Sequence, residues 1–454
     1  VDAHSMKRSL HPQDQLMRRG EDHHVNTTMI DQAFSGIMSM QRASWEQGVL
    51  QSAVTEYYYP QWSVFKKPGH ELYPKPKTLS IKDQPIDLLR LAMSSIDGQD
   101  SAGRLASVIT GDESTGRGAS MDSASCGEGV LVGAWIREGF PNNKPDARGM
   151  FGHAAQKQLE YLLHNVTRTP SGALSQRAGS SDPELWSDSA YMGPPFIAFY
   201  GLVTNNQTLV QMAFDQLRLQ HKALARTEGT GRNLWHHIVR FPNARNKSDT
   251  QLIDARVWLT GNGWAAAGML RVAAIISQSP WTDKMKDQYH QLLDWAEDIV
   301  SATYFFVDRG TGLMRNVVDN PKTFYDGSGS ALMSYAAFRL GSMDEQRRGQ
   351  IQWAEKAYQT LSRALDPFSQ FTNGIQTVNE MSSGEVGVTS TESLAFLILM
   401  SAARRDYYQG NTTGTGGAVD PPAPDSSATS VHVRTTVVAC ALIAACMWVM
   451  VNGL

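Results

Sequence analysis

Cysteine is scarce in this sequence, and an excess of basic residues is missing. Only Cys126, Cys440 and Cys446 occur among the 454 residues, and the last two lie in an apolar run at the C-terminus. A disulfide framework is therefore excluded for the body of the chain, which packing must hold together. The formal net charge is −3 at pH 7, whereas nucleic-acid binding relies on clustered Lys and Arg. We therefore expect no nucleic-acid partner.

Common catalytic and metal-binding motifs are missing as well. The HExxH, GxSxG and P-loop patterns do not occur. The adjacent residues His236 and His237 point in different directions on a helix or a strand, which disfavours a joint metal site. Cys126 lies at a Gly/Ser-rich helix start, where close packing is a better explanation than a nucleophile. We expect neither a metal ion nor an organic cofactor.

The chain ends in an apolar run at residues 437–451, VVACALIAACMWVMV. This run is shorter than the about 20 residues that a membrane-spanning helix needs. A small triplet at residues 426–428 and eight mostly polar residues precede it. This order is typical of the signal for a glycosylphosphatidylinositol (GPI) anchor, with Ser426 as the attachment residue, and a retained tail anchor is the alternative. Since residues 1–15 contain no apolar segment and a GPI-anchored protein needs an entry signal, we infer that a secretion signal has been removed or is omitted from this sequence.

Five Asn-x-Ser/Thr sequons fit passage through a glycosylating pathway, although some sequons arise by chance. They are Asn26, Asn165, Asn206, Asn246 and Asn411. With the C-terminal signal, they predict an extracellular glycoprotein that a lipid anchors to the plasma membrane or cell wall.

Composition divides the chain into four segments. Residues 1–28 are a polar extension, and residues 29–408 carry apolar residues at helical spacing. Residues 409–436 form a stalk rich in Gly, Pro, Ser and Thr, and residues 437–454 hold the terminal signal. We expect the long segment to be one catalytic domain and the protein to be a monomer.

A repeat runs through the long segment. Six stretches have a polar or small start followed by a Gly/Ala-rich apolar helix, and they are separated by 64 to 77 residues. Amphipathic helices at 150–164, 206–222, 284–302 and 344–364 lie between them. Because such units bury their faces only against neighbours, the repeat predicts an all-α fold, an (α/α)6 toroid of six helical hairpins. Residues 28–59 fit either one long helix or two.

The repeat places polar residues at the starts of its inner helices: Asp122, Asp188, Asn262, Asp326 and Glu392. In a toroid these starts open onto one face. Helix capping is the alternative explanation, and we favour it for Asp326 and Glu392. For Asp122 and Asp188 we favour catalysis, since two facing carboxylates are the usual equipment of a glycosidase.

Aromatic residues accompany these carboxylates. Tyr191 follows Asp188 closely in the sequence LWSDSAYMGPPF. Four tryptophans could offer flat faces on which sugar rings stack, or they could simply fill the core. These are Trp186, Trp235, Trp258 and Trp264.

Five segments resemble one known family. WSDSAYMGPPF is similar to the W-x-D-x-x-Y-M-x-x-P-F segment of the unsaturated rhamnogalacturonyl hydrolases, glycoside hydrolase family 105, which are related to the unsaturated glucuronyl hydrolases. MDSASCGEG resembles their L-D-D-x-x-x-G segment, LWHHI the segment with their active-site His, WLTGNGWAAAG their W-x-R-G-N-G-W, and YDGSGSALM their E-x-S-x-S-A-M. The segments occur in family order over residues 40–405.

The resemblance implies an (α/α)6 barrel and removal of a 4,5-unsaturated uronic acid from pectin-type or related oligosaccharides. An Asp of such enzymes protonates the C4=C5 vinyl ether, water adds at C5, and the hemiketal collapses. Carried over, Asp188 is the general acid/base and Asp122 supports it. His237, Trp258 and Trp264 line the site, with Trp264 stacked on the sugar. Trp186, Tyr191 and Asn262 are further substrate-binding residues.

Three departures concern the substrate. Thr260 replaces the family Arg before G-N-G-W, residues 238–240 replace a Gly-Trp-Asp, and Ser123 replaces the second Asp of L-D-D. We predict that Arg177 supplies the missing cation, with Arg256 as second choice and a plain surface arginine as the alternative. The rival functions are an inverting glycosidase on a neutral wall polysaccharide such as mannan, and a non-catalytic wall-associated sugar-binding protein.

Overall fold

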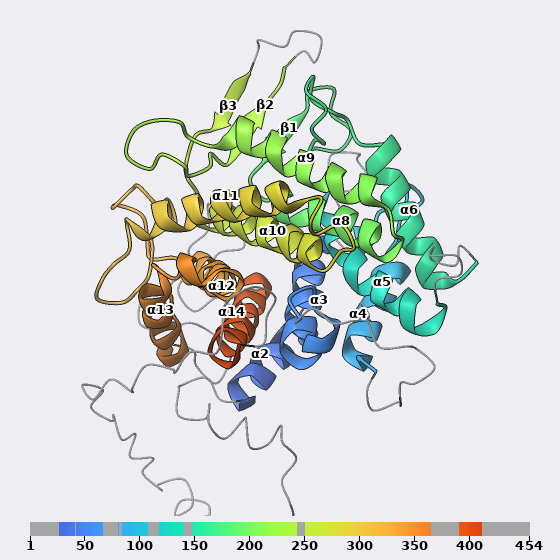
Figure 1. Cartoon of the computed structure of the whole chain (residues 1–454), viewed down its shortest axis with the longest axis horizontal. Helices are drawn as coiled ribbons and strands as arrows, with labels where there is room; N and C mark the ends of the chain where they lie inside the picture. Colours follow the sequence, from blue (N-terminus) through green and yellow to red (C-terminus); the bar gives the residue numbers. More distant parts are fainter. Residues whose placement is uncertain are drawn as a thin grey trace, which may run out of the picture. The chain divides into compact units, whose positions relative to one another are not determined.

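The computed structural model describes residues 27–40, 42–66, 80, 84–107, 118–139, 148–242, 250–364 and 390–410. Helices dominate these residues (Figure 1). They are α2 (Thr27–Ser39), α3 (Ser44–Tyr58), α4 (Ile86–Asp97), α5 (Gly127–Arg137), α6 (Met150–His164), α7 (Ser189–Met192), α8 (Pro194–Val203), α9 (Gln207–Leu224), α10 (Leu259–Ser277), α11 (Lys286–Tyr304), α12 (Gly327–Met343), α13 (Ile351–Ala364) and α14 (Thr391–Gln409). The 3-10 helix η6 (Asp122–Cys126) leads directly into α5.

The inner helices form a closed ring. Each contacts the next in the order α3, η6–α5, α7–α8, α10, α12 and α14, and α14 contacts α3 again. Their Gly/Ala-rich sequences permit this close approach. A Cβ on Gly268 of α10, for example, would lie 2.1 Å from the main-chain oxygen of Ala190 in α7. Ring closure confirms the predicted toroid.

The outer helices pack on the outside of the inner ring: α4 packs on α5 and α3, α6 on α5, α9 on α8, α11 on α10 and α12, and α13 on α12. In Figure 1, α6, α9 and α13 lie outside the central helices. The last hairpin joins distant parts of the chain, because α2 packs on α14. Residues 28–59 therefore form two helices, α2 and α3, with different places in the fold.

The predicted outer helices agree with the structure except at one start. The segment 344–364 begins its α-helix only at Ile351, because Asp344 caps a separate 3-10 turn, Glu345–Arg347. Its side chain accepts a hydrogen bond from the Gln346 main-chain nitrogen at 3.0 Å.

A buried charge network joins the inner helices α3, α5, α10, α12 and α14. Arg271 of α10 pairs with Glu56 of α3 and with Glu128 of α5. Arg339 of α12 pairs with Glu56 at 2.7 Å and with Asp406 of α14 at 2.8 Å. All five side chains are almost inaccessible to solvent, so each charge depends on its partners. The sequence analysis did not predict this network.

A small antiparallel sheet also escaped the sequence analysis. Its strands are β1 (Glu184–Trp186), β2 (Ile238–Arg240) and β3 (Gln251–Asp254), in the order β1-β2-β3. Three or four residues are too few to show a clear alternation in the sequence. In Figure 1 the strands lie beyond α9, and β1 leads directly into α7.

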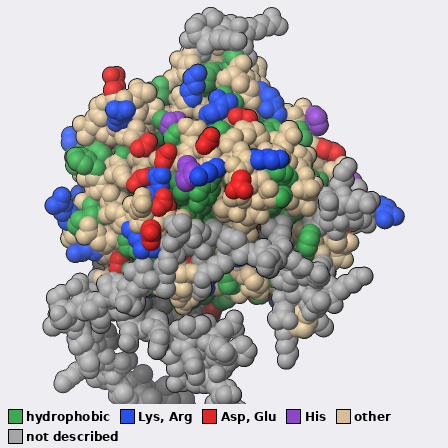
Figure 2. Space-filling model, viewed as in Figure 1, with side chains coloured by type: hydrophobic (Ala, Val, Ile, Leu, Met, Phe, Trp, Pro, Cys, Tyr) green, Lys and Arg blue, Asp and Glu red, His purple; other side chains and the backbone are tan. Residues whose placement is uncertain are grey.

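The described surface carries charges of both signs, which are interspersed on the face seen in Figure 2. Asn165 and Asn206 are exposed, and the Asn206 side chain also caps α9. Ser426, Asn26, Asn246, Asn411 and the apolar run 437–451 lie outside the described residues. Among the helices that are described, none combines the length and the apolar character needed to cross a membrane.

Candidate active site

Asp188 lies directly before α7, at the start of an inner helix. Its main chain is helical, with φ −60° and ψ −34°, and its side chain makes no capping hydrogen bond. The Pro194-Pro195 pair starts a second helix, α8, so the inner helix is interrupted beside the carboxylate. Asp188 Oδ2 accepts a hydrogen bond from Ser187 Oγ at 3.1 Å. Capping therefore does not explain Asp188.

His237 faces this carboxylate from the loop before β2. Its Nε2 lies 3.5 Å from Asp188 Oδ2, and its Nδ1 lies 3.0 Å from Asp254 Oδ2. The indole rings of Trp186 and Trp258 approach the imidazole edge-on, with centroid distances of 5.5 and 4.9 Å. Burial alone would lower the pKa of His237, but the hydrogen bonds and charges of the two carboxylates raise it to about 9. The imidazole is therefore cationic at neutral pH.

Asp254 ends β3 and was not predicted as a site residue. It accepts hydrogen bonds from Arg256 Nε and Nη2, both at 2.9 Å, besides its contact with His237. Burial would raise the pKa of Asp254, but these hydrogen bonds hold it well below its usual range. His236 points elsewhere, with Nδ1 2.7 Å from the Ala255 main-chain oxygen, as expected for adjacent residues.

Asp122 lies in η6 and is connected to the same region through Gln176. The Gln176 amide donates to Asp122 Oδ1 at 2.5 Å and accepts from Ser189 Oγ at 2.9 Å. This chain of bonds leads from Asp122 to Ser189, the residue that follows Asp188. The sequence contained no signal for Gln176, since a glutamine in a loop has no characteristic pattern.

The two remaining acidic helix starts differ from each other. Asp326 caps α12 through the Gly329 main-chain nitrogen at 2.9 Å, as expected. The capping explanation of Glu392 is wrong, because Ser390 caps α14. Glu392 is 1% exposed, and its pKa is raised well above the usual value by burial and then by Glu46, Asp188 and Asp326. Glu392 therefore belongs to the acidic group around Asp188.

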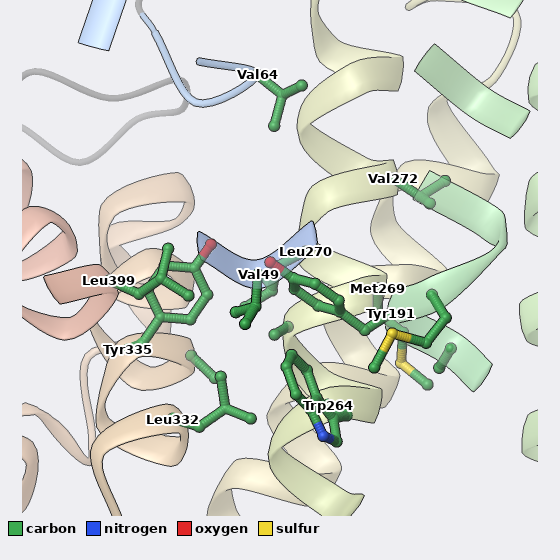
Figure 3. Packing of buried hydrophobic residues seen from close by; sticks show 14 of the residues in the cluster. Val49, Val64, Tyr191, Trp264, Met269, Leu270, Val272, Leu332, Tyr335 and Leu399 are labelled. Carbon is green, nitrogen blue, oxygen red and sulfur yellow. The ribbon is translucent and has the colours of Figure 1, made fainter. Parts of the chain in front are cut away.

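Trp264 and Tyr191 lie in the core. Trp264 is 1% exposed, and its ring contacts those of Tyr191 and Phe396 at centroid distances of 4.5 and 4.7 Å. Figure 3 shows Trp264 and Tyr191 side by side among aliphatic side chains such as Leu332. A ring without a free face cannot stack on a sugar. The structure thus favours core filling for Trp264 and Tyr191, and equally for the fully buried Trp235.

Asn262 also differs from its expected role. Its amide group donates to the main-chain oxygens of Trp235 and Trp258 at 3.0 and 2.9 Å, and it accepts from the Trp235 nitrogen at 2.8 Å. The side chain is fully buried. Asn262 therefore holds the segment that carries Trp258 and is not free to bind a ligand.

The candidate cations lie on the sheet side of the site. Arg177 is exposed, and its guanidinium is 6.0 Å from the Trp186 ring centroid. Within the described ranges, no carboxylate forms an ion pair with it. Arg256 is exposed too, but it is engaged by Asp254. Thr260 is fully buried, with Oγ1 3.5 Å from Asp326 Oδ2, and supplies no charge.

Two residues that interact with Asp188 or His237 carry a buried polar atom without a hydrogen-bond partner in the part of the chain that the structure describes. They are Trp258, with Nε1 on the ring that contacts His237, and Glu392, with Oε2 on a carboxylate that interacts electrostatically with Asp188. Buried polar atoms are normally paired, so such atoms beside two ionisable groups fit a polar ligand. The region around Asp188 and His237 is therefore the candidate active site.

The family model for Glycosyl Hydrolase Family 88 matches residues 143–413, which include Asp188, His237, Asp254 and Glu392. The chain belongs to this family. It is accordingly a glycoside hydrolase, and the expected kinship is confirmed.

Several solved structures share the fold of this chain. A possible family 105 member from Salmonella enterica serovar Paratyphi A is 13% identical with a TM-score of 0.62, covering 85% of this chain and 96% of its own. An unsaturated glucuronyl hydrolase specific for heparin is 13% identical with a TM-score of 0.54, covering 88% and 100%. An unsaturated glucuronyl hydrolase from a Bacillus species, responsible for glycosaminoglycan degradation, is 14% identical with a TM-score of 0.50, covering 81% and 98%. At these identities the likeness establishes the six-hairpin fold.

Proposed function

We propose that this family 88 enzyme removes a 4,5-unsaturated uronic acid from the end of an oligosaccharide by hydrating its vinyl ether. The observation that carries the proposal is the Asp188 carboxylate, which caps no helix and lies 3.5 Å from His237 Nε2. Family membership and the sequence segments similar to the unsaturated uronyl hydrolases support the choice of reaction.

The proposed reaction needs one group that gives a proton and takes one back. Asp188 in its acid form protonates C4 of the vinyl ether, which leaves an oxocarbenium ion at C5. Water adds to C5 and returns its proton to Asp188. The hemiketal at C5 then opens, and the bond to the rest of the oligosaccharide breaks. His237 Nε2 lies 3.5 Å from Asp188 Oδ2, so the imidazole can hold the transferable proton beside the carboxylate before the first step and after the last.

The uronate carboxylate needs a cation or several donors, because burial without a partner costs several kcal/mol. Thr260 cannot supply a charge, and Arg256 is already bound to Asp254. Arg177 beside Trp186 is therefore the proposed carboxylate-binding residue.

Conversion of Asp188 to Asn tests the assignment of the acid. Asp188→Asn keeps the side-chain shape and removes proton transfer, so turnover of an unsaturated oligouronide falls about 10³-fold with unchanged folding. Asp122→Asn has a smaller effect, since Asp122 acts through Gln176. Loss of vinyl-ether absorbance measures the rate. Asp215→Asn, which breaks an exposed pair with Arg218 on α9, serves as control. More than a tenth of wild-type activity in Asp188→Asn would refute the role of Asp188.

A neutral-sugar glycosidase is the second candidate, and the uncharged, buried Thr260 favours it. Activity on a mannan-type oligosaccharide without activity on the unsaturated uronide would establish that alternative. In either case we propose that the protein acts at the cell surface on a GPI anchor, on the strength of the C-terminal signal.

A further inference from the structure

A line of four alternating charges crosses the sheet side of the active site. Arg256 binds Asp254 through Nε, Nη2 and its main-chain nitrogen, at 2.9, 2.9 and 3.0 Å. Asp254 Oδ2 lies 3.0 Å from His237 Nδ1, and His237 Nε2 lies 3.5 Å from Asp188 Oδ2. With Asp188 ionised and His237 protonated, the four formal charges cancel. In this charge state the line carries no net charge.

The main chain holds the same residues in place. The His237 main-chain nitrogen donates to Arg256 O at 3.0 Å, and the Ser187 nitrogen donates to His237 O at 3.0 Å. The β2–β3 pairing has a register shift between Ile238 and Val239, directly after His237. Irregular pairing at this point lets the imidazole reach both carboxylates, since bulges reorient side chains.

Asp254 determines which imidazole nitrogen can exchange a proton. An ionised carboxylate only accepts hydrogen bonds, so the facing Nδ1 must carry its hydrogen permanently. In the described residues, the titratable groups that face the ring are Asp188 and Asp254, and the indoles of Trp186 and Trp258 cover its other sides. The exchangeable proton is therefore on Nε2, next to Asp188.

We propose that Asp254 and Arg256 are positioning residues that keep the hydrogen of His237 on Nδ1, so that Nε2 and Asp188 share one transferable proton. This inference rests on the proposed role of Asp188. The proton leaves the pair for C4 of the substrate, and the water that adds at C5 restores it. No proton or electron is consumed over the cycle.

Replacement of Asp254 by Asn removes the negative charge and lets the amide nitrogen donate to Nδ1. The imidazole then changes tautomer or loses its cationic form. The same replacement in a catalytic triad lowers activity because its histidine takes the wrong tautomer. We expect kcat to fall about 100-fold while KM changes by less than about threefold, because the substrate contacts are unchanged. Since Asp254 raises the pKa of His237, the alkaline limb of the kcat profile moves to lower pH.

Two further variants and a control separate positioning from a loss of structure. Asp254→Glu restores the charge and recovers part of the activity and the wild-type alkaline limb. Arg256→Gln leaves the Asp254 carboxylate in place, so the alkaline limb of its kcat–pH profile lies between those of the wild type and Asp254→Asn. The control is Asp319→Asn, which breaks a half-buried pair with Arg226 (2.6 Å) that includes none of the four charges in this line, and it leaves the pH profile unchanged. Melting temperatures of all variants identify misfolded ones.

NMR of the substrate-free protein, with its histidines labelled with nitrogen-15, provides a second readout that is independent of activity. Long-range proton–nitrogen NMR spectra of the full chain should show His237 with a hydrogen on Nδ1 and a titration that moves to lower pH in Asp254→Asn. An unchanged kcat profile and titration in a folded Asp254→Asn would overturn the positioning role while leaving the proposed reaction intact. If the wild-type enzyme does not hydrate the uronide, the proposed function fails, and the positioning role falls with it.

Discussion

Removal of the Arg177 side chain tests how this enzyme binds an acidic sugar. The family position that holds an Arg is Thr260 here, so a uronate needs another cation. Arg177 lies in the loop that leads to β1, with its guanidinium 6.0 Å from the Trp186 ring. Trp186 in turn contacts the His237 imidazole at a centroid distance of 5.5 Å. Arg177 is thus connected to the proposed acid through successive contacts of Trp186 and His237.

The exposure of Arg177 sets the size of the expected effect. From the sequence alone, a buried pair would be worth about 2 to 4 kcal/mol. The structure shows an exposed side chain, for which solvent screening reduces the value to about 1 kcal/mol. This corresponds to an about fivefold increase in KM for Arg177→Ala, with little change in kcat.

The assay compares an unsaturated uronide with its methyl ester. Arg177→Ala should raise KM for the acid and leave the ester unaffected, because the ester carries no charge. High salt should shrink the difference between wild type and variant, since an exposed pair is screened. Arg218→Ala, which removes an equally exposed arginine on α9, controls for net charge. An equal loss on both substrates, or none on either, would remove Arg177 from the site and favour a neutral sugar.

The remaining predictions concern stability and location. Glu56→Gln leaves Arg271 and Arg339 short of a buried partner, so the free energy of unfolding in urea falls by about 3 kcal/mol or more; a loss below about 1 kcal/mol would show that the network contributes little. Salt should not change this loss, because the pairs are inaccessible to solvent. Phosphatidylinositol-specific phospholipase C should release the protein from cells, whereas retention with peptide 437–451 still detectable would favour a tail anchor.

The architecture could be predicted from the sequence because it follows from local properties that repeat. Small residues all round one helix and a single apolar stripe on the next specify an inner and an outer position in every hairpin. Asp188 could be identified for the same reason, since it starts a repeat and lies within a recognisable segment. Short strands escaped prediction because three residues provide no measurable period.

What the tertiary structure decided is which side chains meet. Trp258 and Trp264 look alike in the sequence, yet Trp258 contacts His237 while Trp264 packs against Tyr191 in the core. Helical spacing specifies which face is buried but not how far along the axis a residue lies from the open end of the ring.

Charge partners depend on ring closure in the same way. Asp254 reaches His237 through a strand pairing, and Glu392 comes under the influence of Asp188 only because α14 returns to α3. The electrostatic energy of such contacts depends on distance and burial in three dimensions. Sequence alone therefore determined the scaffold and pointed to Asp188 as the proposed acid, whereas the charges and hydrogen bonds around Asp188 were decided by the fold.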